Sequence, residues 1–300
     1  MKNTLSMTVA GVMIVLLAGT ARAQSIEERL QKFGEEYAKG YVGPMGDQFG
    51  AALNSGWYHT ADVSNGIDIY FGVRGMLMPL PEESKTFTIK SPWNGAVDSP
   101  PTAFGPDQEV TVSGVAPGAN PQFYAKGQNI SMSVLPVPHI SAGNIFGTRL
   151  MLRFLPPVEL GDAGKLGFFG IGAQHSLSQY IPTVPLDLSA HAAYSRFSLG
   201  DLLSATGFTI GVEASKSFAL LTVYGGVAYE TSSFSFGYDA SYTDPITMQA
   251  VNERVGFDIS GANNVRATIG LTLSLGFLKI NADYSAASQS VIVAGLGIGI

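Results

Sequence analysis

Charged residues recur at alternate positions of extended, otherwise apolar stretches, and they are the first candidates for chemistry in this sequence. Successive side chains of a β-strand point to opposite faces. These residues would therefore share one face of a sheet, while the apolar residues between them form the other. Such a charged face can pair within itself or can line a path for a solute. Its members are Asp68, Arg74, Arg149, Arg153, His191, Glu213, Glu230, Arg266, Lys279 and Asp283.

Catalysis is the less favoured use of these residues. His191, with Ser189 and Ser195 on the same predicted face, is the one set that suggests a base and a nucleophile. Neighbours of that kind within one strand lie too far apart for direct proton transfer. We therefore predict that the protein is not an enzyme.

Metal and cofactor chemistry is also not expected. The chain has no cysteine, which excludes disulfides, thiolate metal sites and a cysteine nucleophile. Its four histidines have no spacing that would place two of them together as metal ligands. They are His59, His139, His175 and His191.

Period-2 alternation from residue 67 onward predicts the strands that must carry the charged face. The clearest stretch is 263–276, where Val265, Ile269 and Leu273 alternate with polar or small residues. Further pieces at 84–90, 107–113, 231–242 and 251–259 could extend hairpins or add strands, so the predicted number is 10 to 14. The ten main strands are expected near 66–78, 128–137, 143–155, 164–176, 187–198, 205–216, 218–231, 263–276, 277–287 and 289–300.

Composition and strand length favour a membrane barrel over a soluble β-sandwich. The chain is 46% apolar and 13% charged, with a mean hydropathy of +0.21. After the first two dozen residues no apolar run approaches the roughly 18 residues of a helical span. The strand runs reach the roughly 9 to 11 residues that cross a bilayer when tilted. The predicted fold is all-β: a transmembrane antiparallel outer-membrane β-barrel of 10–14 strands with a short N-terminal helix and plug segment.

The N-terminus has the form of a secretory signal peptide. Lys2 supplies the positive region, Val9–Leu17 the apolar region and Ala21-Arg22-Ala23 the cleavage site. Cleavage between Ala23 and Gln24 would send the chain through the Sec pathway towards a bacterial outer membrane. Removing Lys2 and Arg22 leaves 15 basic residues (17 − 2) and 23 acidic ones, a net charge of −8. An acidic chain without basic clusters is not expected to bind nucleic acid.

Residues 24–65 are expected to form a helix and a plug-like segment before the barrel at 66–300. Ser25 to Lys39 has the pattern of a short helix, which Gly43-Pro44 is predicted to end. The following residues are small or aromatic and could form a periplasmic arm or a plug inside the barrel.

The lengths of the connections predict which end of the barrel faces which side. The short links at 215–218 and 276–278 are expected on the periplasmic side, together with the N-terminus. The long segments 79–127 and 232–262 are then predicted to be cell-surface loops.

The order of these features resembles that of a group of uncharacterised outer-membrane β-barrels. Four segments carry this resemblance: residues 49–57, 152–157, 175–182 and 221–230. More distantly, the N-terminal arrangement is similar to that of the outer-membrane long-chain fatty-acid transporter family. That resemblance implies an N-terminal segment that plugs a 14-stranded barrel and gates the diffusion of hydrophobic substrates.

Two uses of the barrel remain open at the level of the sequence. The first is passive transport of small solutes, hydrophobic ones included, through a lumen that the N-terminal segment gates. The alternative is a structural or surface-interaction barrel with a blocked lumen. The partners expected in either case are outer-membrane lipid and the outer-membrane assembly machinery, with a small hydrophobic solute added in the first. A soluble secreted β protein is a third reading.

Overall fold

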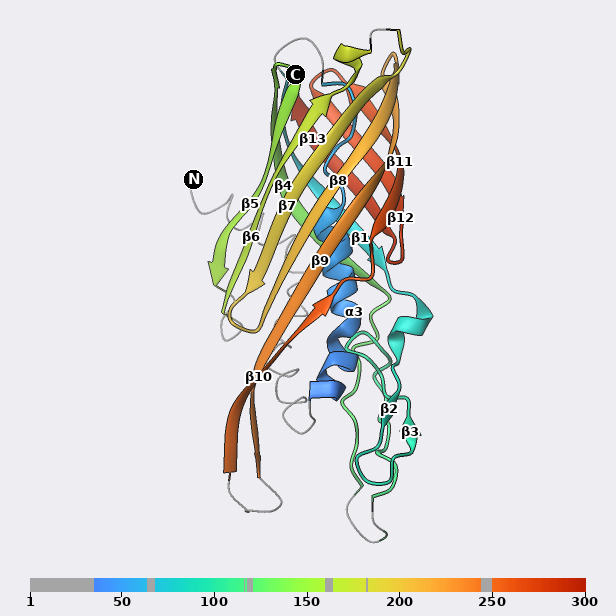
Figure 1. Cartoon of the computed structure of the whole chain (residues 1–300), viewed down its shortest axis with the longest axis vertical. Helices are drawn as coiled ribbons and strands as arrows, with labels where there is room; N and C mark the ends of the chain where they lie inside the picture. Colours follow the sequence, from blue (N-terminus) through green and yellow to red (C-terminus); the bar gives the residue numbers. More distant parts are fainter. Residues whose placement is uncertain are drawn as a thin grey trace.

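The computed structural model contains a closed antiparallel β-barrel (Figure 1). It describes residues 35–63, 68–115, 117, 121–159, 164–181, 183–243 and 250–300. Within these residues ten strands form the ring, and each pairs with its neighbour along the chain. Pairing of β1 with β13 closes it. The ten strands are β1 (Asp68–Pro79), β4 (Met132–Ile145), β5 (Thr148–Glu159), β6 (Lys165–Ser176), β7 (Asp187–Leu199), β8 (Leu203–Phe218), β9 (Leu221–Thr243), β11 (Val265–Leu275), β12 (Leu278–Ala286) and β13 (Val291–Gly299).

The predicted antiparallel barrel is confirmed, and its ten strands correspond to the ten main alternating stretches. The additional pieces do not add strands to the ring. The stretch 231–242 continues β9, and 251–259 becomes β10 (Ala250–Ser260), which pairs with the far half of β9. The stretch 84–90 forms a short helix, η2 (Glu82–Lys85), and strand β2 (Ile89–Lys90), which pairs with β3 (Val97–Asp98). At 107–113 there is one isolated bridge, Thr111 to Phe123.

Alternation along each strand separates an outer apolar face from an inner face. In β13, Val291 and Val293 are fully buried, whereas Ile292, Leu296 and Ile298 are 41–57% exposed on the other side. Large apolar side chains are exposed in the same way on the other strands of the ring, for example Phe71, Leu150, Ile210 and Ile269. The outside of the barrel is therefore mainly apolar, and the buried polar side chains of the strands lie on the inner face.

The two ends of the barrel differ in their connections. At the end where β1 begins, two-residue turns join β4 to β5, β8 to β9 and β11 to β12. Phe146, Gly147, Ala219 and Gly276 in these turns have positive φ angles, as the tight turns of twisted hairpins require. We call this the turn end, and the opposite end, where β1 finishes at Pro79, the loop end.

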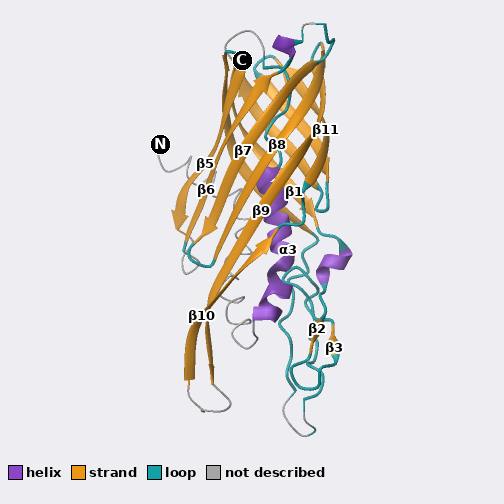
Figure 2. Ribbon diagram, viewed as in Figure 1, coloured by secondary structure: helices purple, strands orange, loops and turns teal. Residues whose placement is uncertain are grey.

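A folded cap covers the loop end (Figure 2). It consists of the excursion 80–131 between β1 and β4, the hairpin of β9 and β10 beyond the ring, and the first half of helix α3 (Glu35–Asn54). Tyr41 of α3 donates to the carbonyl of Lys126 at 2.8 Å, and the hydroxyl of Tyr37 accepts from the backbone N–H of Ala125 at 2.9 Å. The prediction that residues 232–262 form a loop is therefore wrong, because most of this stretch belongs to the paired strands β9 and β10.

Asp98 holds the excursion of the cap together. Its carboxylate accepts hydrogen bonds from the hydroxyl and backbone N–H of Ser113 and, at 2.8 Å, from the hydroxyl of Tyr124. Partial desolvation opposes ionisation of Asp98, but these three bonds outweigh it and lower the pKa of the carboxyl. The same contact, together with burial, raises the pKa of Tyr124.

Helix α3 does not end at Gly43-Pro44, so that prediction is wrong. The helix passes through Pro44 and continues to Asn54. A proline inside a helix removes one backbone hydrogen bond and costs about 3 kcal/mol. Packing on both sides of Pro44 offsets this, since Tyr41 and Val42 before it and residues 51–53 after it are buried. The predicted helical residues 25–34, and the signal peptide with its Ala23–Gln24 cleavage site, lie outside the described residues.

The part of the chain that the structure describes contains no helix apolar and long enough to cross a membrane.

Candidate functional site in the barrel lumen

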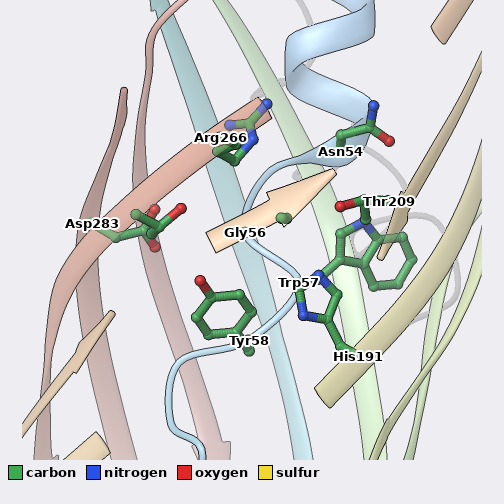
Figure 3. Close-up of a pocket in the computed structure, with 10 residues that line it drawn as sticks. Asn54, Gly56, Trp57, Tyr58, His191, Thr209, Arg266 and Asp283 are labelled. Atoms are coloured by element: carbon green, nitrogen blue, oxygen red, sulfur yellow. The ribbon is translucent and has the colours of Figure 1, made fainter. Parts of the chain in front are cut away.

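The chain crosses the whole lumen between residues 48 and 63, which we call the inner segment. At the loop end, Gln48 of α3 donates to Gln289 at 2.9 Å. At the turn end, the carbonyl of Asp62 accepts from Arg149 of β5 at 2.8 Å. The helix enters from the cap, ends inside the barrel at Asn54 and continues as extended chain towards the turn end (Figures 1 and 3).

Four arginines of the barrel wall each bind a backbone carbonyl of the inner segment. In order along the segment, Arg266 binds Ala51 at 3.0 Å, Arg153 binds Ser55 at 2.9 Å, Arg74 binds Tyr58 at 3.3 Å, and Arg149 binds Asp62. They come from three strands, β11, β5 and β1. All four guanidinium-bearing residues are buried. Because a guanidinium carries five N–H donors and can only donate, each carbonyl oxygen satisfies part of the hydrogen-bonding capacity of a buried arginine.

Neutral side chains of the wall bind further carbonyls of the same segment. Ser195 donates to Leu53 at 3.1 Å, Thr272 to His59 at 2.6 Å, and Gln174 to Thr60 at 2.8 Å. The wall thus holds the backbone of the inner segment from its helical part to its last residues.

Two of the four arginines are also paired with wall carboxylates. Arg266 donates to both oxygens of Glu230, at 2.7 and 3.0 Å, and Arg149 forms an ion pair with Asp68. Glu230 is fully buried. Both pairs join residues of different strands, so they fix the wall as well as the inner segment.

Glu213 of β8 is the centre of a polar network that Gln174 links to Arg149. It accepts hydrogen bonds from Gln174 at 2.9 Å and Ser189 at 2.8 Å, and it lies 2.7 Å from Nδ1 of His191. Its carboxylate is therefore well satisfied without an arginine.

Arg74 and Arg153 differ from the other two arginines, because neither makes an ion pair within the described residues. Their additional partners are imidazole rings: Arg74 lies 2.8 Å from Nδ1 of His59, and Arg153 lies 3.2 Å from Nδ1 of His139. A guanidinium has no acceptor, so both nitrogens accept and both rings carry no proton at Nδ1. The guanidinium of Arg153 also stacks 3.9 Å from the ring centroid of Trp57.

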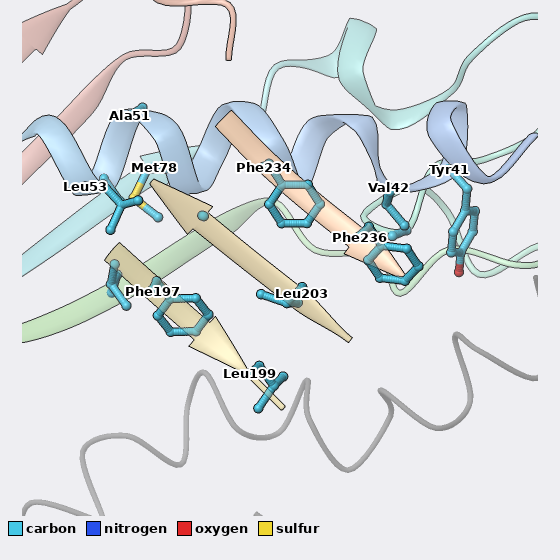
Figure 4. Packing of buried hydrophobic residues seen from close by; sticks show 14 of the residues in the cluster. Tyr41, Val42, Ala51, Leu53, Met78, Phe197, Leu199, Leu203, Phe234 and Phe236 are labelled. Atoms are coloured by element: carbon cyan, nitrogen blue, oxygen red, sulfur yellow. The ribbon is translucent and has the colours of Figure 1, made fainter. Parts of the chain in front are cut away.

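The half of the lumen nearer the loop end is apolar (Figure 4). There Leu53 and the rest of the inner face of α3 pack against aromatic and aliphatic wall residues, with Phe49 4.8 Å from Phe197 and 5.9 Å from Phe234 between ring centroids. We call this the apolar collar. Its wall residues include Met76, Met78, Phe197, Leu199, Leu203, Phe234, Phe236 and Val293.

A small cavity remains between the extended part of the inner segment and the wall formed by β7, β8, β9, β11 and β12 (Figure 3). Gly56, Trp57 and Tyr58 line it on one side, and Thr209 and Asp283 are among its wall residues. Polar atoms of Thr209 and Asp283 face no partner among the residues described. The cavity is therefore polar.

The structure brings most of the candidate residues together around the inner segment. Arg74, Arg149, Arg153 and Arg266 contact it directly, as described above. Asp68, Glu213 and Glu230 bind those arginines or their neighbours, and His191 is held by Glu213. Asp283 accepts from Tyr224 at 2.9 Å. Lys279 lies apart and donates to Ser274 at 3.2 Å.

Several lumen residues were not among the sequence candidates. His139 lies two residues beyond the predicted strand 128–137, and Gln174 has the inward parity but no charge. A search that included uncharged polar residues at the inward-facing positions of each predicted strand would have found Gln174 and Thr272. Nothing in the sequence marks His59 as the partner of Arg74.

The residues described contain no cluster of three or more His, Asp or Glu side chains that could hold a metal ion. Of the suggested catalytic set, Ser189 and His191 both contact Glu213, whereas Ser195 donates to the backbone of Leu53.

Comparisons with known proteins give one full-length match. A family model described as "Family of unknown function (DUF6588)" matches residues 1–300. A search of curated proteins finds no match.

Among solved structures, the similar chains include a mutant porin of Rh. blastica and two proteins of Pseudomonas. The Rh. blastica porin aligns with 9% identity over 78% of this chain and 100% of its own, at a TM-score of 0.22. OccK2 (OpdF) of Pseudomonas aeruginosa, solved with glucuronate, aligns with 10% identity over 81% and 100%, at 0.15. A BenF-like porin from Pseudomonas fluorescens Pf-5 aligns with 9% identity over 78% and 98%, also at 0.15. The barrel is established here by its own strand pairing, and its ring of ten strands is smaller than the 14 strands that the fatty-acid transporter resemblance implies.

Proposed function

The chain belongs to DUF6588, a family of unknown function, and we propose that it is an outer-membrane barrel which passes small polar solutes when its inner segment is displaced. In this structure the inner segment runs through the lumen and is hydrogen-bonded to its wall. The wall arginines that bind its backbone carbonyls are the observation that carries the proposal.

The outer surface supports a location in a membrane. Apolar side chains cover the outside of the ring, where a bilayer would remove them from water. Exposed aromatic residues also gather at the turn end: Phe146 is 89% exposed, Phe218 59% and Phe277 69%. Aromatic side chains at one end of an apolar band are typical of a membrane interface.

The polar half of the lumen supports passage of a solute. Burying charged groups is unfavourable, and a barrel filled only for stability would gain more from apolar side chains. Here the wall arginines donate hydrogen bonds to backbone carbonyls of the inner segment, which belongs to no strand of the ring. If that segment withdraws, the same side chains line a polar path, which favours a polar solute over a hydrophobic one.

The alternative is a barrel that remains closed and acts through its cap. The number of hydrogen bonds between the wall and the inner segment favours this reading, since hydrogen bonds to charged groups contribute about 1.5–3 kcal/mol each. The two functions differ in one observable property: only the first predicts ion conductance that depends on the position of the inner segment.

A reversible tether would test the proposal. Thr60 of the inner segment and Ser215 of β8 have hydroxyl oxygens 3.2 Å apart, so Thr60→Cys with Ser215→Cys could form a disulfide. A matched pair within the wall, Ser217→Cys with Thr222→Cys, replaces exposed hydroxyls of β8 and β9 that lie 2.9 Å apart and hydrogen-bond each other. The natural chain has no cysteine, so no other disulfide can form.

Both pairs would be made in a full-length Gly56→Val chain. Gly56 has φ +67°, and a side chain there would meet Val293 at 3.0 Å, so this change loosens the segment without altering the wall. In planar bilayers, we expect conductance that oxidation of the 60–215 pair abolishes and reduction restores, while oxidation of the 217–222 pair has no effect. Absence of conductance in every form would support the closed barrel instead. Conductance that oxidation of the 60–215 pair leaves unchanged would place the path elsewhere.

A further inference from the structure

One side of the lumen wall carries a group of buried hydrogen-bond donors that the inner segment does not fully satisfy. It is formed by β12, β13, β1, β4 and β5, which are adjacent in the ring. Five of its side chains are at most 2% exposed and have a polar atom with no hydrogen-bond partner among the described residues. We call them the donor wall: Tyr70 (hydroxyl), Arg74 (Nε), Ser141 (hydroxyl), Arg153 (Nη1) and Asn281 (side-chain amide).

These side chains lie near one another. Arg74 stands 5.5 Å from the ring centroid of Tyr70, and Tyr70 lies 5.9 Å from His139, which Arg153 contacts. Asn281 and Arg74 are both aligned with Gly295 of β13, one from each side. Because Gly295 has no side chain, nothing on β13 separates these two residues at that level.

Neither guanidinium group of the donor wall forms an ion pair with a lumen carboxylate within the described residues, although the charge of Asp283 acts on both. Glu230 binds Arg266, Asp68 binds Arg149, and Glu213 is satisfied by Gln174, Ser189 and His191. Asp283 accepts from Tyr224 and makes no ion pair within the described part of the chain. The hydrogen-bond partners of the two buried guanidinium groups, Arg74 and Arg153, are therefore all neutral.

A carbonyl oxygen is an incomplete partner for a guanidinium. Each carbonyl of the inner segment, that of Ser55 for Arg153 and that of Tyr58 for Arg74, offers a single uncharged oxygen. A carboxylate or phosphate offers two or more charged oxygens in the geometry that a guanidinium binds through two parallel hydrogen bonds. Such an ion would satisfy donors that the inner segment leaves free.

We propose that the donor wall binds small oxyanions of the carboxylate or phosphate type once the inner segment leaves it, and that these are the solutes the barrel passes. The inference rests on the proposed function and names its substrate class. The backbone oxygens of Ser55 and Tyr58 occupy the places that oxyanion oxygens take during passage.

The experiment measures ion selectivity in the full-length Gly56→Val chain. Reversal potentials in gradients of potassium acetate, potassium phosphate and potassium chloride give the permeability of each anion relative to potassium. We expect anions to permeate better than potassium. The permeabilities of acetate and phosphate should be higher than the values expected from their size relative to chloride. Arg74→Gln with Arg153→Gln should lower the anion preference several-fold, towards a ratio of one.

Two further variants make the result specific. Lys90→Gln with Lys165→Gln removes the same charge from exposed positions outside the lumen and should leave selectivity unchanged. Arg74→Lys with Arg153→Lys keeps the charge but loses the two parallel bonds, so it should retain anion preference and lose the advantage of acetate and phosphate over chloride. If the glutamine pair does not fold, the lysine pair still tests whether the two arginines set the preference for acetate and phosphate.

The outcomes separate the two proposals. Conductance without anion preference, or with a preference that neither Arg74/Arg153 pair alters, would overturn the oxyanion site and leave the gated barrel standing. Absence of any conductance would overturn both.

Discussion

The two halves of the lumen hold the same segment by different physical means. In the apolar collar, α3 is fixed by the shapes of side chains such as Leu53, Phe197 and Phe234. In the polar half, the wall binds backbone carbonyls of the segment as well as side chains such as Trp57 and His59. The collar is therefore a permanent anchor built by packing, whereas the polar half is a set of replaceable hydrogen bonds. The gating that we propose would use both: packing that keeps the helix in place and hydrogen bonds that can be exchanged.

Breaking the buried ion pair of the polar half should have the largest effect on stability. Arg266→Gln would leave Glu230, which is fully buried, without its cation. Removing one member of a buried pair costs about 3–5 kcal/mol. The free energy of unfolding, from urea titration of the folded band on a detergent gel, should fall by about this amount. Arg266→Gln with Glu230→Gln should restore part of it. A loss below about 1 kcal/mol for the single variant would mean that the pair is hydrated and the polar half is open to water.

Creating a cavity in the apolar collar should have the second-largest effect on stability. Leu53 is fully buried in the collar, and Leu→Ala at such positions costs about 2–5 kcal/mol. We expect Leu53→Ala to lower the free energy of unfolding in this range and to increase conductance, because the anchor of the gate is weakened. Leu186→Ala, at a 41% exposed position outside the lumen, is the control and should change stability by less than about 0.5 kcal/mol. Equal effects of the two would contradict the anchoring role of the collar.

Removing one neutral bond to the inner segment should have a smaller effect. Thr272→Val keeps the shape of the side chain but loses the donor to the carbonyl of His59, at a cost of about 1–3 kcal/mol. The seated inner segment should become less stable, seen as more frequent opening in single-channel records of the otherwise natural chain. Thr222→Val removes a hydroxyl that contacts Ser217 within the wall and should leave the opening frequency as it was.

The smallest effect on stability is expected from protonation of Asp98 at acidic pH, which should affect the cap and not the barrel. The pKa of Asp98 is lower in the folded cap than in the unfolded chain, so its ionised form stabilises the cap above the unfolded pKa of about 3.9. That contribution is lost as the pH falls through the lowered folded value. Proteolysis of the excursion 80–131 should therefore increase below about pH 4, while the barrel remains resistant. In Asp98→Asn this acid-induced increase should be absent; the same increase in that variant would assign it to another group.

The sequence was sufficient to predict the ring because alternation is a local property. A strand with one apolar and one polar face shows that pattern whatever it pairs with, and all ten ring strands were found in this way. The far half of β9 and its partner β10 were less clear, since Phe234, Phe236 and Phe257 are buried by the cap rather than facing outward.

The path of the inner segment could not be predicted for the opposite reason. Many of its contacts use backbone carbonyls, which every residue has, so no residue pattern records those contacts. The continuation of α3 through Pro44 depends on packing against strands far away in the chain, and this overrides a local signal that predicts a helix end. The pairing of His59 with Arg74 likewise depends on where the segment lies.

The closed ring also sets an order of events in assembly. The inner segment emerges at both ends of the barrel, into the cap at one end and into β1 at the other. Once β13 pairs with β1, the ring surrounds a helix whose outer half is packed into the cap, and that helix cannot enter from the side. The simplest sequence is that the earliest-made residues are already in place when the last-made strand arrives. Pairing of β1 with β13 is then the last step of assembly, and the ring closes around an inner segment that is already in place.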